Sequence, residues 1–170
     1  QSESSSKKDE EIQIVAEQGT QNILDVIDDK CKIIFPSTHV VFEGIEKVKK
    51  KIEENEVTKP VLSYSTSKAL NEKQLKESGK NYIILRLGSV YGYSTDTARI
   101  DIMPNLFSKI SSQNGTLKLF SGGRQLKSLV PLIDVARCFK FMEERDDLSS
   151  ETFNLVKDTL TVKKVAEICK

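Results

Sequence analysis

Two residues in the string YSTSK, Tyr64 and Lys68, have the types and the spacing of a proton-transfer pair. On a helix, side chains four residues apart lie on the same face, so the phenol and the ammonium would address one site. A phenol is a weak base at neutral pH, but an ammonium about 5 Å away stabilises the phenolate by roughly 3 kcal/mol at an effective dielectric of about 20. The pair therefore indicates proton exchange with a hydroxyl group.

In a chain of this composition, a tyrosine followed four residues later by a lysine is expected by chance about 0.5 times. The surroundings of the pair therefore decide whether it has a chemical role or is a chance pair on the surface. The apolar run 32–35 predicts a strand that ends at Pro36, followed at once by the polar residues Ser37 and Thr38. Residues 82–87 predict the next strand. Polar groups meet at the carboxyl edge of a parallel sheet. There we expect Thr38 to hold in place the hydroxyl group that loses its proton to Tyr64.

Apolar periodicity predicts an α/β protein. Helices are expected at residues 12–27, 62–78, 103–110, 133–144 and 162–169. Strands are expected at residues 32–35, 82–87, 117–120, 128–130 and 153–156. Strands that alternate with helices favour a sheet built from right-handed crossovers.

Composition excludes several classes of function. The chain has 170 residues, 38% of them hydrophobic and 30% charged, with a formal net charge of +1. This balance is typical of a globular protein with one modest core, and it does not favour nucleic acid as a partner. No apolar run approaches the roughly 20 residues of a bilayer span, so we expect no membrane partner.

Cysteine and histidine usage indicates a cytoplasmic protein without a metal site. Cys31, Cys138 and Cys169 are odd in number and far apart, which suits reduced thiols better than disulfides. His39 is the one histidine, so the sequence offers no cluster of metal ligands.

Five strings resemble, in order and spacing, the extended short-chain dehydrogenase/reductase family, especially its NAD-dependent nucleotide-sugar epimerases and dehydratases. The strings are IIFPSTHVVFEG, SYSTSKALNEKQL, YIILRLGSVYG, LFSGGRQLKSLVPLIDVARC and FNLV. Together they extend over nearly all of residues 11–169. The resemblance implies part of a Rossmann-like, doubly wound parallel sheet with the start of a C-terminal substrate lobe.

The same resemblance implies roles for nine residues. It makes Thr38, Tyr64 and Lys68 a catalytic triad, in which Tyr64 is the acid/base and Lys68 tunes it. The implied cofactor is NAD, with NADP open, and it would contact Pro36, Ser37, Tyr64, Lys68 and Leu87. The implied substrate is a nucleotide sugar, which would contact Thr38, Ser89, Arg124 and Lys127.

One departure from the family concerns the cofactor fingerprint, a glycine-rich turn after the first strand. The sequence lacks it, so we expect the N-terminal Gly-rich half to be missing and this piece to be inactive by itself. We then expect residues 1–10 to be a flexible segment and residues 11–100 to be the C-terminal half of a Rossmann-like domain. Residues 101–170 would be a partial substrate lobe, interleaved with the final sheet elements.

The leading functional hypothesis is an NAD(P)-dependent nucleotide-sugar epimerase that moves hydride reversibly at a sugar carbon. Dehydration is disfavoured, because His39 and Val40 stand where the family's sugar dehydratases have two acidic residues. A keto-sugar reductase, which the string STHVVFEG also resembles, and a non-catalytic binding subunit remain as alternatives. Helices over 11–28 and 62–78 look like the family's dimer-forming pair, so we expect a homodimer.

Overall fold

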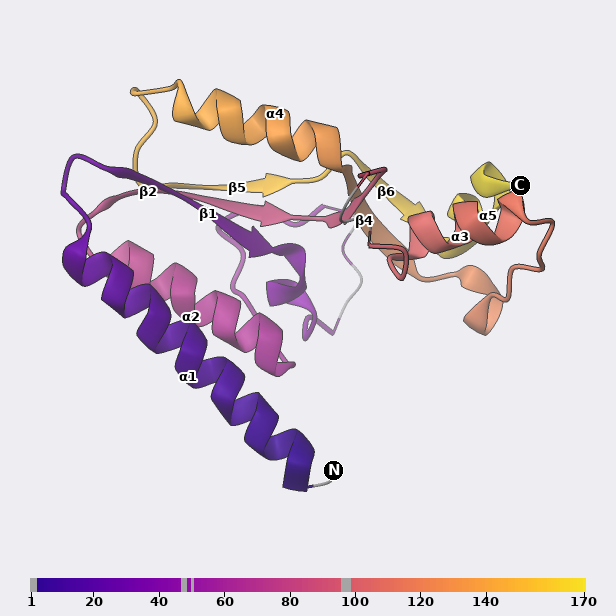
Figure 1. Ribbon diagram of the computed structural model, residues 1–170, viewed down its shortest axis with the longest axis horizontal. Coiled ribbons are helices and arrows are strands. Elements are labelled where there is room, and N and C mark those ends of the chain that lie inside the picture. Colours follow the sequence, from indigo (N-terminus) through magenta and orange to yellow (C-terminus); the bar gives the residue numbers. More distant parts are fainter. Residues whose placement is uncertain (1–2, 47–48, 50, 96–98) are drawn as a thin grey trace. The chain divides into compact units, whose positions relative to one another are not determined.

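The computed structural model describes residues 3–46, 49, 51–95 and 99–170, which form an α/β architecture (Figure 1). Contacts divide the chain into two compact units. The first unit comprises Gln1–Arg86 and Phe141–Asn154, and the second comprises Leu87–Lys140 and Leu155–Lys170. Within the described residues, no helix is long and apolar enough to cross a membrane.

A three-stranded sheet with the order β1-β2-β5 organises the first unit. Its strands are β1 (Lys32–Thr38), β2 (Asn81–Leu87) and β5 (Glu151–Leu155), and all three run in the same direction (Figure 1). The central strand β2 buries Ile83, Ile84 and Leu85 completely. Burial on both faces explains why residues 82–85 of this strand are continuously apolar instead of alternating.

Helices α1 (Glu3–Val26) and α2 (Ser63–Glu77) lie side by side against the strands of this sheet (Figure 1). Their shared core consists of Leu24, Leu75 and Ile84, one residue from each of α1, α2 and β2. A short 3-10 helix, η1 (His39–Phe42), follows β1 directly. The end of β1, η1 and the start of α2 are therefore parts of one packed unit.

The second unit contains a separate sheet with the order β3-β4-β6. Strand β3 (Ser89–Tyr91) runs parallel to β4 (Leu126–Pro131), which pairs antiparallel with β6 (Asp158–Thr161). The remaining elements are α3 (Met103–Ser112), η2 (Phe120–Gly123), α5 (Val162–Cys169) and α4 (Leu132–Glu143), of which the last three residues belong to the first unit. Its core gathers Phe107, Leu129, Val165 and Ala166.

Two expected boundaries near the N-terminus differ from those observed. Helix α1 begins at Glu3, so residues 3–10 of the expected flexible segment are helical, and residues 1 and 2 lie outside the described residues. Strand β1 continues through Pro36 to Thr38. Proline is tolerated there because β1 lies at the edge of the sheet, where a missing N–H need not interrupt a ladder.

The expected strand at residues 117–120 is wrong. Leu117 and Leu119 pack against the core of the second unit, so their alternation reflects burial, but they belong to no strand. The chain then turns through Ser121, Gly122 and Gly123, all with positive φ. Two short strands, β3 and β6, were not anticipated from the sequence because each has too few residues to show a period.

The contacts divide the chain after residue 86, whereas the sequence suggests a domain boundary near residue 100. Residues 141–154 also return to the first unit after the chain has built most of the second. The assignment of 11–100 to a Rossmann-like domain and of 101–170 to a substrate lobe stays a prediction.

Candidate active site

The carboxylate of Glu43 caps the N-terminus of α2, the helix that carries Tyr64. Glu43 Oε1 accepts hydrogen bonds from the backbone N–H groups of Val61, at 2.8 Å, and Leu62, at 2.7 Å, and also from the hydroxyl of Ser65. Leu62 itself has no side chain that could cap the helix. The negative charge of Glu43 also interacts favourably with the positive end of the helix dipole. The first turn of α2 is thus held by a residue from the segment that follows η1.

The same contacts determine the protonation state of Glu43. Desolvation raises its pKa, but the hydrogen bonds from Ser65, Leu62 and Val61 outweigh that effect, and the pKa of Glu43 lies below its ordinary value. Hydrogen bonds to a carboxylate favour its charged form. The cap is therefore ionised at neutral pH.

Lys68 reaches from α2 to the end of β1. Its Nζ donates a hydrogen bond of 2.9 Å to the carbonyl oxygen of Pro36 and lies 4.6 Å from the centre of the Phe35 ring. Desolvation by burial lowers the pKa of Lys68. A cation over an aromatic face gains electrostatic attraction, which offsets part of that burial cost. The lysine is thereby anchored two residues before Thr38.

Tyr64 and Lys68 line one cavity of about 380 Å³ together with Phe35. Its other walls are Ser67 and Asn71 of α2 and one side of α1, formed by Ile12, Val15, Ala16, Gly19, Thr20 and Ile23. Tyr64 is 53% exposed, so part of its side chain is accessible from solution. The volume lies within the usual range for small-molecule sites, which is roughly 300–1,000 Å³.

Thr38 and Ser37 are buried at the end of β1 and have different partners. The Oγ1 of Thr38 accepts a long hydrogen bond of 3.4 Å from the N–H of Val40, which leaves its own proton available for donation. The Oγ of Ser37 donates to Glu72 Oε1 at 2.5 Å. Ser37 therefore points its hydroxyl at α2, while Thr38 caps the start of η1.

The sequence analysis missed Glu43, Glu72 and Arg86, which organise this region. For two of them a signal existed: Glu72 lies four residues after Lys68 on the same helix face, and Arg86 is the single charge in the apolar run YIILRL. A charge within a buried strand needs a partner, because an unpaired buried charge is very costly. The identity of that partner could not be read from the sequence.

Comparison with known proteins places the chain in a family. The model of the NAD dependent epimerase/dehydratase family matches residues 2–155. The chain belongs to this family. The resemblance derived from the five strings is thereby confirmed, while no curated protein matches the sequence.

Three solved structures illustrate the fold of this epimerase/dehydratase chain. UDP-glucose 4-epimerase of Thermotoga maritima, solved with UDP-glucose, is 23% identical with a TM-score of 0.78, covering 96% of this chain and 54% of that one. UDP-glucose 4-epimerase of Thermus thermophilus, solved with NAD, is 21% identical with a TM-score of 0.75, covering 91% and 53%. UDP-glucuronic acid 4-epimerase of Bacillus cereus, solved with UDP-glucuronic acid and NAD, is 20% identical with a TM-score of 0.76, covering 93% and 50%. The chain spans about half the length of these structures, and the likeness concerns the fold alone.

The remaining expected site residues of this epimerase/dehydratase chain lie in the second unit. Leu87 ends β2, and Ser89 begins β3, where it pairs with Leu129 of β4. Lys127 lies on β4 and is half-buried, whereas Arg124 follows η2 and is exposed. Ser89 and Lys127 are thus on neighbouring strands of one sheet, two positions apart in register.

Proposed function

We propose that this chain carries the proton-transfer residues of an NAD-dependent nucleotide-sugar epimerase, with Thr38, Tyr64 and Lys68 as the catalytic residues. The observation that carries this proposal is the hydrogen bond of 2.9 Å between Lys68 Nζ and the carbonyl oxygen of Pro36. It joins the helix of Tyr64 to the strand that ends at Thr38. Family membership supports the same reaction class.

In the proposed mechanism, Tyr64 takes a proton from a sugar hydroxyl and later returns it. The ammonium of Lys68 stabilises the phenolate by its charge, and the hydroxyl of Thr38 donates a hydrogen bond to the same sugar oxygen. Lys68 has three N–H donors, of which one is engaged by Pro36. The other two are available to hydroxyl groups of a ribose.

Bound NAD would supply reversible hydride exchange with the sugar carbon, so the overall reaction would have no net redox change. The residues of the first unit suit the nicotinamide-ribose half of this cofactor: Lys68 offers donors, Phe35 offers an apolar wall, and the cavity has about 380 Å³. Pro36, Ser37 and Leu87 complete the proposed contacts. The sequence contains no G-x-G-x-x-G turn for the pyrophosphate, so the fit concerns the nicotinamide half. A preference for NAD over NADP is not part of the proposal.

The proposed substrate is a UDP-sugar, in line with the UDP-sugars that accompany similar structures. Arg124 and Lys127 would supply positive charge to the diphosphate, and Ser89 would supply a hydroxyl donor. Thr38 would contact the sugar at the reacting carbon.

The test is Tyr64→Phe in the longest natural polypeptide that contains this sequence, with UDP-glucose and UDP-glucuronic acid as substrates. We expect kcat to fall by about 10²–10⁴, the usual contribution of general acid/base catalysis. Proton NMR of the anomeric signals measures the turnover. Tyr93→Phe removes the same hydroxyl from an 83% exposed residue of the second unit and serves as the control. Wild-type turnover by Tyr64→Phe would show that the triad is wrong.

A keto-sugar reductase is the second candidate, favoured by the string at residues 37–44. The two reactions differ in cofactor use, because a reductase oxidises one NAD(P)H per product and an epimerase oxidises none. Absorbance at the reduced-nicotinamide band in the same assay separates them. Nucleotide-sugar binding without turnover of any substrate would instead indicate a non-catalytic binding subunit.

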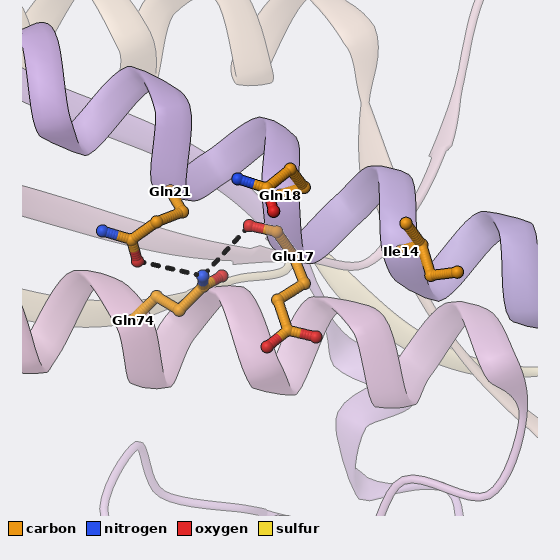
Figure 2. A pocket seen from close by; sticks show the side chains of 5 residues that line it. All are labelled: Ile14, Glu17, Gln18, Gln21 and Gln74. Carbon is orange, nitrogen blue, oxygen red and sulfur yellow. Dashed lines mark hydrogen bonds between the residues drawn. The ribbon is translucent and has the colours of Figure 1, made fainter.

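We further propose that the protein is a homodimer through α1 and α2. Helix α1 exposes Ile14 and Val26, apolar side chains outside the proposed cofactor cavity that a partner surface would cover. Figure 2 shows the groove beside Ile14, where Gln74 of α2 donates to the carbonyl oxygen of Glu17 at 3.1 Å. Glutamine side chains in such a groove can exchange hydrogen bonds with a second copy.

We propose that the protein is cytoplasmic, and its cysteines support this proposal. Cys31, Cys138 and Cys169 are all free thiols. Free thiols persist in a reducing compartment.

A further inference from the structure

A charge pair with almost no exposure lies beneath the candidate site. Glu72 of α2 and Arg86 of β2 have side chains that are 3% and 2% exposed. Arg86 Nη2 donates to Glu72 Oε2 at 2.7 Å and Nε donates to Oε1 at 3.0 Å, so the pair is bidentate. Apolar residues of similar volume would often be equally stable in such a place, because burying two charges costs desolvation energy. Stability alone therefore does not explain the pair.

The contacts of the pair reach each segment that carries a proposed catalytic residue. Glu72 accepts from Ser37, the neighbour of Thr38, at 2.5 Å. Arg86 lies 4.9 Å from the ring centre of Phe42 in η1, and its Nη1 donates to the carbonyl oxygen of Glu54 at 2.9 Å. One ion pair thus links α2, β1, β2 and η1.

The spacing along α2 gives these links a geometric consequence. Tyr64, Lys68 and Glu72 follow one another at intervals of four residues and therefore share one helix face. We propose that Glu72, Arg86 and Ser37 form a positioning network, which sets the rotation and the axial position of α2 relative to β1. Through these elements it positions Tyr64 and Lys68 with respect to Thr38. This inference rests on the proposed roles of those three residues.

Directionality is the physical reason for assigning this role to the network. A bidentate arginine–carboxylate contact is satisfied in a narrow range of angles and distances, whereas apolar contacts tolerate rotation and sliding of a helix. A misplacement of about 1 Å in an active site costs about 100-fold in rate. An apolar replacement would keep α2 packed but would fix its rotation and axial position relative to β1 less tightly.

The experiment compares three variants. Glu72→Leu with Arg86→Leu removes both charges, so that neither remains buried without a partner. Arg86→Lys keeps the positive charge but loses the fork. Lys73→Gln with Glu77→Gln removes an ion pair of the same helix, separated by 3.9 Å and with both side chains 67% exposed, and is the matched control.

Three measurements are made on each variant. Urea unfolding reports stability, and NMR of tyrosine labelled with ¹³C at Cζ reports the environment of Tyr64, assigned with Tyr64→Phe. Turnover of UDP-glucose in the longest natural polypeptide gives kcat and KM. The ¹³C signal of Tyr93, in the second unit, serves as the internal reference.

We expect the Leu/Leu variant to retain the urea midpoint of the wild type, while the Tyr64 signal shifts or splits. Its kcat should fall about 100-fold with KM changed less than about threefold, as expected for lost alignment. Arg86→Lys should show the same pattern, and the control variant should match the wild type in all three measurements. If the network only stabilised the fold, the Leu/Leu substitution would change the midpoint of urea unfolding and leave the Tyr64 signal of the folded protein unchanged.

A folded Leu/Leu variant with an unchanged Tyr64 signal would overturn the proposal. If that variant does not fold, Arg86→Lys decides by the same signal. If the wild type proves inactive, the proposed function fails, but the Tyr64 signal still decides whether the network positions α2.

Discussion

At the scale of single residues, the capping of α2 by Glu43 is the contact most open to direct test. Its carboxylate serves two backbone N–H groups and the Ser65 hydroxyl. Caps of this type contribute about 1 kcal/mol to the free energy of unfolding. We expect Glu43→Ala to lose about that amount, as measured by urea unfolding, and Glu43→Gln to lose less because its amide oxygen still accepts.

The pH dependence of this cap follows from the lowered pKa of Glu43. A group whose pKa is lower in the folded state stabilises the fold above its unfolded pKa and loses that effect as pH falls through the folded value. The stability difference between wild type and Glu43→Ala should therefore be full at neutral pH and shrink below the ordinary glutamate pKa of 4.5. A difference independent of pH between neutrality and about pH 3 would contradict a charged cap.

At the scale of elements, two glycines should respond in opposite ways to alanine. A Cβ at Gly44 would lie 2.6 Å from the carbonyl oxygen of Lys59, where the chain leaving η1 contacts the chain entering α2. Gly44→Ala should cost about 1–3 kcal/mol in the free energy of unfolding, since this contact is with a backbone atom. Urea unfolding gives the value.

Gly19→Ala is the matched substitution within a helix. A Cβ at Gly19 of α1 meets nothing within 4 Å, so there is no clash to oppose the gain in helix propensity. We expect stabilisation of about 0.5–1 kcal/mol, again from urea unfolding. Destabilisation would mean that α1 needs the freedom of glycine at this position.

At the scale of the whole molecule, the proposed homodimer gives a concentration-dependent prediction. Sedimentation equilibrium of the longest natural polypeptide should give twice the mass of one chain for the wild type. Ile14→Glu should yield monomers, because it places a charge on a 63% exposed apolar residue of α1 beside Glu17. Phe120→Glu, at an 87% exposed residue of the second unit, should remain dimeric. A monomeric wild type at all concentrations would contradict the interface.

Local periodicity predicted those helices and strands in which the spacing of apolar residues also marks the buried side. Helix α5 coincides with its expected range, α2 is one residue shorter than expected at each end, and β2 begins one residue earlier than expected. The agreement is close because apolar spacing reports both the conformation and the buried side. Tyr64 and Lys68 were proposed for the same reason, since their spacing along α2 is a local property. The family followed from strings that are themselves local.

Tertiary structure alone decided which distant residues meet. Glu72 accepts hydrogen bonds from Arg86 and Ser37, and Glu43 caps the N-terminus of α2. Sequence spacing does not report such contacts between separate elements. Edge position made Pro36 acceptable in β1, and the lack of a strand partner left residues 117–120 out of a sheet. Strand formation depends on a neighbour and capping depends on a distant acceptor, so both are properties of the packed chain.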